Sequence, residues 1–140
     1  MLKFQILYFL CDPAPQGLDR RAEQAGKVLE VLLQVNTSGS ENQSGAAPEV
    51  LPDLVAALAP LAYLRIRGLM TIGAYSDDEA VVRSCFSTLR TLSEKIAAGG
   101  FEGVAMDYLS MGMSSDLEAA IAEGATHVRV GTDIFGARDH

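Results

Sequence analysis

The chain has 140 residues, a length typical of one domain with a substantial hydrophobic core. Hydrophobic residues make up 49% of it and the mean hydropathy is +0.17, which excludes an intrinsically disordered chain. The formal net charge of −7 argues against a protein that follows a nucleic-acid backbone, because such proteins need a basic surface.

The N-terminal segment contains a continuous apolar run over residues 4–10. This run is at the short end for the hydrophobic region of a signal peptide, and no cleavage motif of small residues follows it. It is far too short to cross a membrane. We therefore predict a buried strand that ends before Asp12 and Pro13, and no contact with a membrane.

The two cysteines, Cys11 and Cys85, are far apart and neither belongs to a CxxC motif. They predict no disulfide framework, and a reducing cytoplasm is the simplest location for the protein. Cys85 lies on the apolar face of a predicted helix. We interpret it as an inert thiol in the core.

Strand and helix patterns alternate along the first half of the chain. Apolar residues at helical intervals predict a helix over 18–29, and a run rich in valine and leucine predicts a strand over 29–36. After a polar loop, a second helix is expected to begin at Pro48 and Glu49. The next predicted strand covers residues 64–72.

The same alternation continues to the C-terminal end. A capping-box pattern at Ser76 predicts a helix that Gly99 and Gly100 terminate. A short strand is predicted over 107–111, and the last strand over 127–130.

A second capping-box pattern lies between these last two predicted strands. Its residues are Ser115 and Glu118, and it predicts a helix that ends at Gly124.

Strict alternation of strands and helices implies a parallel sheet with right-handed crossovers, in a single domain over residues 1–140. Two α/β architectures fit this pattern, an open doubly wound sheet and part of a (β/α)8 barrel. A complete barrel takes about 250 residues, and this chain has enough for about five strands.

Polar and glycine residues follow the predicted strands, where parallel α/β folds bind ligands. Ser114 and Ser115 stand where a helix begins, and free N–H groups at that end attract anions. Gly131 permits close approach of the backbone, and Thr132 adds a hydroxyl donor. This pattern suggests a phosphate cradle. The alternative is that the glycines only form turns and the serines only cap helices. The polar and glycine residues that follow the predicted strands form four segments, which are residues 36–39, 71–73, 110–114 and 131–132.

Other candidate groups carry less information. Arg129 lies within the last predicted strand, where an arginine points to solvent, pairs with a carboxylate or approaches a ligand. His127 and His140 lack the spacing of metal ligands. No serine lies in the G-x-S-x-G motif of a nucleophile elbow.

Four motifs in the same order resemble the pyridoxal phosphate homeostasis protein family, whose barrel is similar to the N-terminal domain of alanine racemase. The resemblance covers roughly residues 31–139. The motifs are LLQVNTSG (32–39), GLMTIG (68–73), LSMGMSSD (109–116) and VRVGTDIFGARD (128–139).

The resemblance implies a (β/α)8 barrel that binds pyridoxal 5′-phosphate (PLP) and acts as an intracellular carrier or regulator of PLP, without established turnover. It implies that Met113 and Ser114 line the phosphate end, and that Gly131 and Thr132 bind the phosphate. It places Arg129 near the pyridine nitrogen. A permanent charge there disfavours protonation of the ring and makes it a weaker electron sink.

The chain also departs from the family. The part that carries the first strands and the Schiff-base lysine has no counterpart here, and none of Lys3, Lys27 and Lys95 matches the lysine motif. The segment 40–45 also lacks the pair of an acidic residue and a following lysine that relatives usually have in the loop after the first motif. We therefore expect a C-terminal portion of the barrel, which binds PLP weakly and without a covalent bond.

A barrel without its first strands has open edges, through which the chain is expected to self-associate. The alternatives to a PLP carrier are a racemase-like PLP enzyme, which requires a lysine and a second catalytic base, and a fragment without function.

Overall fold

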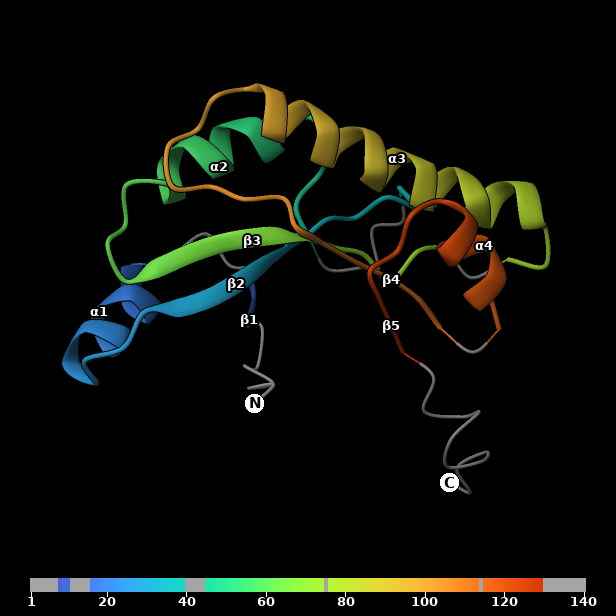
Figure 1. Cartoon of the computed structure of the whole chain (residues 1–140). Coiled ribbons are helices and arrows are strands. Elements are labelled where there is room, and N and C mark those ends of the chain that lie inside the picture. The colour runs from blue at the N-terminus through green and yellow to red at the C-terminus, as the bar shows by residue number, and fades with distance from the viewer. Residues whose placement is uncertain (1–7, 11–15, 40–44, 75, 114, 130–140) are drawn as a thin grey trace, which may run out of the picture.

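A computed structural model describes residues 8–10, 16–39, 45–74, 76–113 and 115–129 of the chain. In this part of the chain strands and helices alternate (Figure 1). The elements are β1 (Tyr8–Leu10), α1 (Gln16–Gln24), β2 (Leu29–Gln34), α2 (Leu51–Leu58), β3 (Leu64–Met70), α3 (Glu79–Ala98), β4 (Tyr108–Met113), α4 (Leu117–Ala122) and β5 (His127–Arg129).

The described strands form one parallel sheet in the order β1-β2-β3-β4-β5. Each strand therefore pairs with its neighbour in sequence, and the order does not reverse as it does in a doubly wound sheet. Helices α2 and α3 lie over the same face of this sheet (Figure 1). Of the two predicted architectures, the structure has the barrel type, as a five-stranded part of a (β/α)8 barrel.

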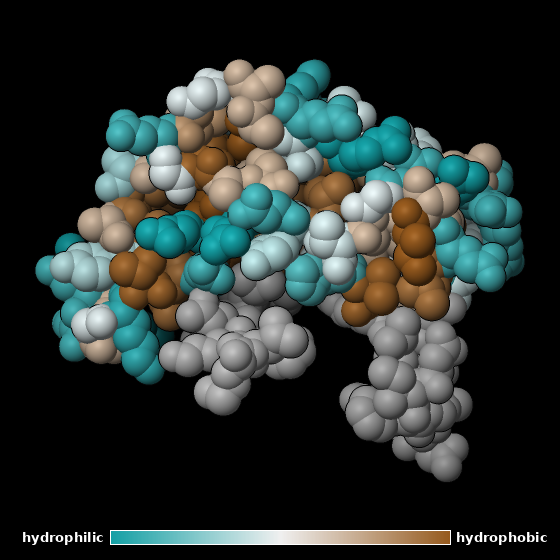
Figure 2. Space-filling model, in the orientation of Figure 1, coloured by the Kyte–Doolittle hydropathy of each residue, from teal (hydrophilic) through white to brown (hydrophobic). Residues whose placement is uncertain are grey.

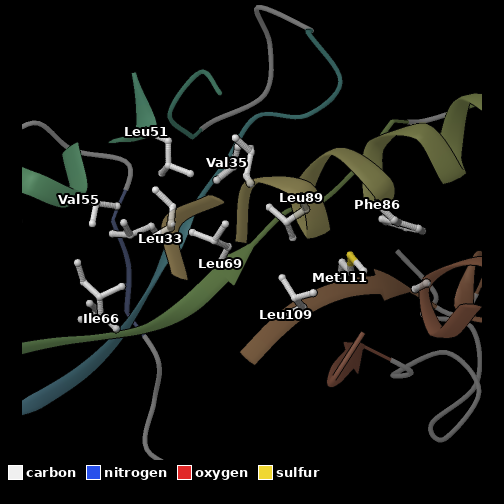
Figure 3. Packing of buried hydrophobic residues seen from close by; sticks show 14 of the residues in the cluster. Leu33, Val35, Leu51, Val55, Ile66, Leu69, Phe86, Leu89, Leu109 and Met111 are labelled. Carbon is white, nitrogen blue, oxygen red and sulfur yellow. The ribbon is translucent and has the colours of Figure 1, made fainter. Parts of the chain in front are cut away.

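The core lies between this face of the sheet and the helices (Figure 3). Leu33 and Val35 follow each other on one face of the β2 segment, because alternate residues of a strand share a face. They lie near Leu69 of β3, with Leu51 of α2 on one side of them and Leu89 of α3 on the other. All five are buried. Burying one such side chain contributes roughly 1.5–3 kcal/mol, so this layer holds the helices on the sheet.

A β-bulge divides the pairing of β2 with β3. Val31 pairs with Ile66, whereas Leu32 pairs with Gly68, so Arg67 has no partner in the register. A Cβ atom at Gly68 would collide with the carbonyl of Tyr108. Glycine therefore permits the close approach of β3 to β4 at this point.

Arg67 forms a polar cluster near the amino ends of the strands. Its guanidinium lies 2.7 Å from Glu30 and 3.0 Å from Asp107, and 5.1 Å from the centre of the Tyr108 ring. Partial burial acts to lower the pKa of Arg67, but Glu30, Tyr108 and Asp107 outweigh it and raise that pKa above its usual value. The cluster ties three strands together at the edge opposite to the carboxyl ends.

Both predicted capping boxes are wrong. The N-cap of α3 is Asp78, whose carboxylate accepts a hydrogen bond from the Ala80 N–H at 2.9 Å. The hydroxyl of Ser76 instead accepts one from the Asp78 N–H at 3.0 Å. The N-cap of α4 is Asp116 rather than Ser115. In each case an aspartate that follows the serine in the sequence is the N-cap. Only Asp78 caps with its side chain, because the Asp116 carboxylate accepts from the Met113 N–H instead of from the helix.

The second helix also begins later than predicted. Residues 48–50 form a turn, and α2 starts at Leu51 with Pro52 in its first turn. Proline is tolerated there because its missing N–H would have no partner inside the helix. The predicted end of α3 at Gly99 and Gly100 is confirmed.

The described surface is mixed in character. Hydrophilic residues cover much of the outer side over α3, and hydrophobic patches reach the surface at the left beside α1 and at the right near α4 (Figure 2). None of the described helices combines the length and the apolar composition that a membrane span requires.

Candidate functional site

The carboxyl edge of the sheet brings together three of the segments that the sequence singled out. Residues 36–39 follow β2, residues 71–73 follow β3, and Met113 is the last residue of β4. Because all the strands are parallel, these segments share one edge, which is where ligands bind in barrels. Hydrogen bonds hold the described part of this edge together.

Thr71 is the centre of a hydrogen-bond network at this edge. Its side chain is buried, and its hydroxyl donates to the carbonyl of Val35 at 2.8 Å. The same oxygen accepts from the N–H of Gly73 at 3.3 Å and lies 2.9 Å from the hydroxyl of Thr37. A hydroxyl has one proton. Since that of Thr71 goes to Val35, the hydroxyl of Thr37 is the donor in the bond between the two threonines.

Helix α3 adds a contact to the same network. The thiol of Cys85 donates to the carbonyl of Thr37 at 3.5 Å, within the distance for sulfur. Cys85 is buried in the core, as predicted. The contact ties the segment after β2 to α3 as well as to β3.

The loop after β2 is closed at its base. The N–H of Asn36 donates to the carbonyl of Ala46, and the N–H of Ala46 donates to the carbonyl of Gln34, both at 2.9 Å. At the start of the loop, the side-chain oxygen of Asn36 accepts from the Ser38 hydroxyl at 3.1 Å and from the Gly39 N–H at 3.2 Å. The four residues 36–39 therefore have a defined conformation.

The passage from β4 to α4 is equally constrained. Gly112 has φ +103°, and a Cβ atom there would collide with Ala120 of α4. The carboxylate of Asp116 accepts a hydrogen bond from the N–H of Met113, and the Asp116 N–H donates to the carbonyl of Met113 at 3.1 Å. The N–H of Met113 is thus already satisfied inside the chain.

Helix α4 is fixed to α3 by ion pairs. The buried carboxylate of Glu123 lies 3.0 Å from Arg83 and 3.0 Å from Arg90, one at each oxygen. Both arginines belong to α3 and are partly exposed. One buried acid therefore links α4 to two turns of the long helix.

A pocket of about 1060 Å³ opens between the β3–α3 and β4–α4 connections. Ile72 and Ala74 form one wall, and Met113 borders it at the end of β4. The ionisable residues in its described lining are all acidic, namely Asp77, Glu79, Asp116 and Glu118. Sequence reasoning did not find this acidic lining, because Asp77 and Glu79 fit the composition of a helix N-terminus equally well.

The structure locates only some of the predicted site residues. Met113 borders the pocket, and the backbone of Arg129 ends β5. Ser114, Gly131 and Thr132 lie outside the described residues, so the predicted phosphate cradle rests on the sequence. The sequence did not reveal that Thr71 is the centre of a hydrogen-bond network at this edge, because its partners Thr37 and Val35 are distant along the chain.

Two of the lysines can be placed. Lys27 is exposed in the turn between α1 and β2, and Lys95 is exposed on the last turn of α3. Neither lies at the carboxyl edge. Lys3 is outside the described residues. Among the described residues, no cluster of three or more histidine, cysteine, aspartate or glutamate side chains is arranged to hold a metal ion.

Comparison with known proteins agrees with this arrangement. A pyridoxal phosphate homeostasis protein from Pseudomonas aeruginosa is 51% identical over 112 residues, which are 80% of this chain and 46% of the relative. The structure of PipY from Synechococcus elongatus with PLP bound is 36% identical, with a TM-score of 0.77, over 86% of this chain and 55% of PipY. An alanine racemase from Clostridium difficile, 18% identical, has a TM-score of 0.75 over 96% of this chain and 35% of that chain, and supports the fold alone.

This chain spans about half the length of the curated relatives that it matches. The family described as "Alanine racemase, N-terminal domain" matches residues 14–139, which is nearly all of it. The match includes the four motifs and the carboxyl edge described above. The chain belongs to the alanine racemase N-terminal domain family.

Proposed function

We propose that this chain binds PLP at the carboxyl edge of its sheet and contributes to PLP homeostasis as a carrier or regulator. The observation that supports the proposal most strongly is the similarity to PipY, whose structure contains PLP. The match covers 86% of this chain at a TM-score of 0.77. The names of the curated relatives support the same function. In this proposal the 140 residues form the C-terminal portion of a PLP-binding barrel.

The pocket has room for the coenzyme, but its described lining suits only part of it. A volume of about 1060 Å³ is sufficient for a small ligand. The four carboxylates would repel a phosphate dianion. We therefore place the phosphate beyond Met113, at Ser114, Gly131 and Thr132, where the sequence offers hydroxyl and backbone donors.

PLP supplies an electrophilic aldehyde and an electron-accepting ring when it is bound. In the proposed site Arg129 approaches the ring nitrogen and disfavours its protonation, because a guanidinium remains charged at any physiological pH. This arrangement weakens the ring as an electron sink. It suits a carrier and is also compatible with racemase-type chemistry, whereas the positions of Lys27 and Lys95 support binding without a covalent bond.

Alanine variants test the phosphate end directly. Ser114→Ala and Thr132→Ala are expected to weaken PLP binding, since each removes a hydrogen bond to a charged phosphate. Ser84→Ala, on the exposed side of α3, is the matched control and should leave the affinity unchanged. Equal affinities for all the variants and the parent chain would overturn the proposed cradle.

We also propose that the chain self-associates through its outer strands. β1 and β5 are the outermost strands of the described sheet, and an unpaired parallel edge readily accepts another strand. Sedimentation velocity at increasing concentration is the test. A sedimentation coefficient that stays at the monomer value throughout would exclude this association.

A further inference from the structure

The residues that follow β2 have no part in the proposed phosphate end, although they occupy the same edge of the sheet. Thr37 is partly buried there, and its position depends on Thr71. The directions of the hydrogen bonds around these two residues determine what Thr37 offers to a ligand.

The hydroxyl proton of Thr37 is already used in the hydrogen bond to Thr71. The carbonyl of Val35 can only accept, so Thr71 must donate to it, and Thr37 must donate to Thr71. The oxygen of Thr71 also accepts from the Gly73 N–H, so it donates one bond and accepts two. While this network is intact, the hydroxyl of Thr37 presents an acceptor, and not a donor, to any molecule at the edge.

The neighbouring serine has the same polarity. The hydroxyl of Ser38 donates to the side-chain oxygen of Asn36, whose identity as the oxygen is supported by the Gly39 N–H that also donates to it. Two consecutive hydroxyls thus direct their protons into the protein. An anion such as phosphate needs donors at this position, whereas an ammonium group needs acceptors.

The charges of the pocket favour the same kind of ligand. Thr37 bonds to Thr71, and the turn after Thr71 continues through Ile72 to Ala74, which both line a pocket whose described ionisable groups are all acidic. Gly73, in the middle of this turn, has φ +83° and is held by its bond to Thr71. Thr71 therefore sets both the polarity of Thr37 and the position of this pocket wall.

We propose that Thr71 is a positioning residue that keeps Thr37 as a hydrogen-bond acceptor, so that this part of the edge favours the ammonium group of a primary amine over phosphate. The inference deepens the proposed function, because it assigns the amine end of a site whose other end binds the phosphate of PLP. Amines are the compounds with which the PLP aldehyde reacts.

The test is an NMR titration of the 140-residue chain that uses no PLP. Ethanolamine and inorganic phosphate serve as probes, and the backbone amides of residues 37–39 and of Gly73 report binding. The parent chain is expected to respond more strongly to ethanolamine at residues 37–39. In Thr37→Val the acceptor is lost, and the ethanolamine response should fall about five- to tenfold, the change expected from one hydrogen bond.

The variants of Thr71 distinguish a role in positioning Thr37 from a general effect on the stability of the fold. In Thr71→Val the proton of Thr37 is released, so the ratio of amine to phosphate affinity should fall about five- to tenfold, and the Gly73 amide should exchange faster. Thr71→Ser keeps the hydroxyl and should restore both. Thr91→Val, which removes an exposed hydroxyl bonded to Ser87 within α3, is the control. It should match the parent chain.

An unchanged ratio of affinities in both Thr71→Val and Thr37→Val would overturn the inference, as would a parent chain that prefers phosphate at residues 37–39. If Thr71→Val does not fold, Thr37→Val still decides the matter, since it leaves the bond from Thr71 to Val35 in place. A chain that shows the amine preference but does not bind PLP would overturn the proposed function and leave this inference standing.

Discussion

The hydroxyls of Thr37 and Thr71 lie 2.9 Å apart, although the two residues are separated by 34 positions in the sequence. This bond joins the ends of two neighbouring strands at the carboxyl edge, where barrels bind their ligands. It is directed from Thr37 to Thr71, because the proton of Thr71 goes to the carbonyl of Val35. The loop after β2 and the turn after β3 therefore form one hydrogen-bonded unit.

Replacing Thr71 by valine should lower the stability of the chain. The change preserves the shape of the side chain but removes its hydrogen bonds to the Val35 carbonyl and from the Gly73 N–H. Losing two buried hydrogen bonds costs about 1–3 kcal/mol. Urea unfolding followed by circular dichroism measures the difference. Thr91→Val is the matched control and should stay within about 0.5 kcal/mol of the parent chain; equal losses in the two variants would contradict the account.

Replacing Gly112 by alanine should also destabilise the chain. Gly112 has a positive φ, and the added methyl group would collide with Ala120. Gly26 also has a positive φ, but the space around it is open, so Gly26→Ala carries only the backbone strain. We expect Gly26→Ala to cost about 1 kcal/mol and Gly112→Ala to cost at least about 1 kcal/mol more.

Thermal unfolding of the two glycine variants is the appropriate comparison. A larger decrease in Tm for Gly112→Ala would support the close packing of α4 on the end of β4. If Gly26→Ala were the less stable variant, this packing would be wrong.

The ion pairs of Glu123 should contribute measurably to the attachment of α4. Glu123→Gln leaves Arg83 and Arg90 without their common carboxylate. Because both arginines are partly exposed, solvent screens part of the interaction, and we expect a loss of about 1–2 kcal/mol. Glu94→Gln, at an exposed position on α3, is the control. The difference in the free energy of unfolding between the two variants, measured in urea, should become smaller in high salt. Equal free energies of unfolding at low salt would refute the role of these pairs.

The chain is expected not to racemise alanine. Racemisation needs a lysine and a second base beside the coenzyme, and the described lysines lie away from the carboxyl edge. L-alanine incubated with the chain and PLP should yield D-alanine at the rate of PLP alone, measured by chiral chromatography. A rate above this background that scales with protein concentration would show that the chain is an enzyme.

Much of the fold could be predicted from the sequence. Apolar runs such as 29–36 predict buried strands, and the predicted bounds differ from those of β2 by two residues at one end. The choice between a doubly wound sheet and a barrel could not be made from these patterns alone. Both architectures use the same alternation of strands and helices, and they differ in the order in which the strands pair and in which faces of the sheet the helices cover.

The caps and the site were harder to predict for a physical reason. Ser76 and Asp78 both accept hydrogen bonds from backbone N–H groups, and only the path of the chain decides which one becomes the N-cap. The position of Thr71 at the end of a strand could be read from the sequence. Its bonds to Thr37 and to Val35 could not, since they depend on the pairing of β2 with β3.

The most direct test of the account is a PLP titration of the purified 140-residue chain, followed by absorbance before and after borohydride. We predict saturable binding, no reduced adduct on any lysine by mass spectrometry, and release of PLP on dialysis. No saturable binding would contradict the central claim that this chain binds PLP. A reduced adduct on a single lysine would show that binding is covalent, contrary to the proposed site.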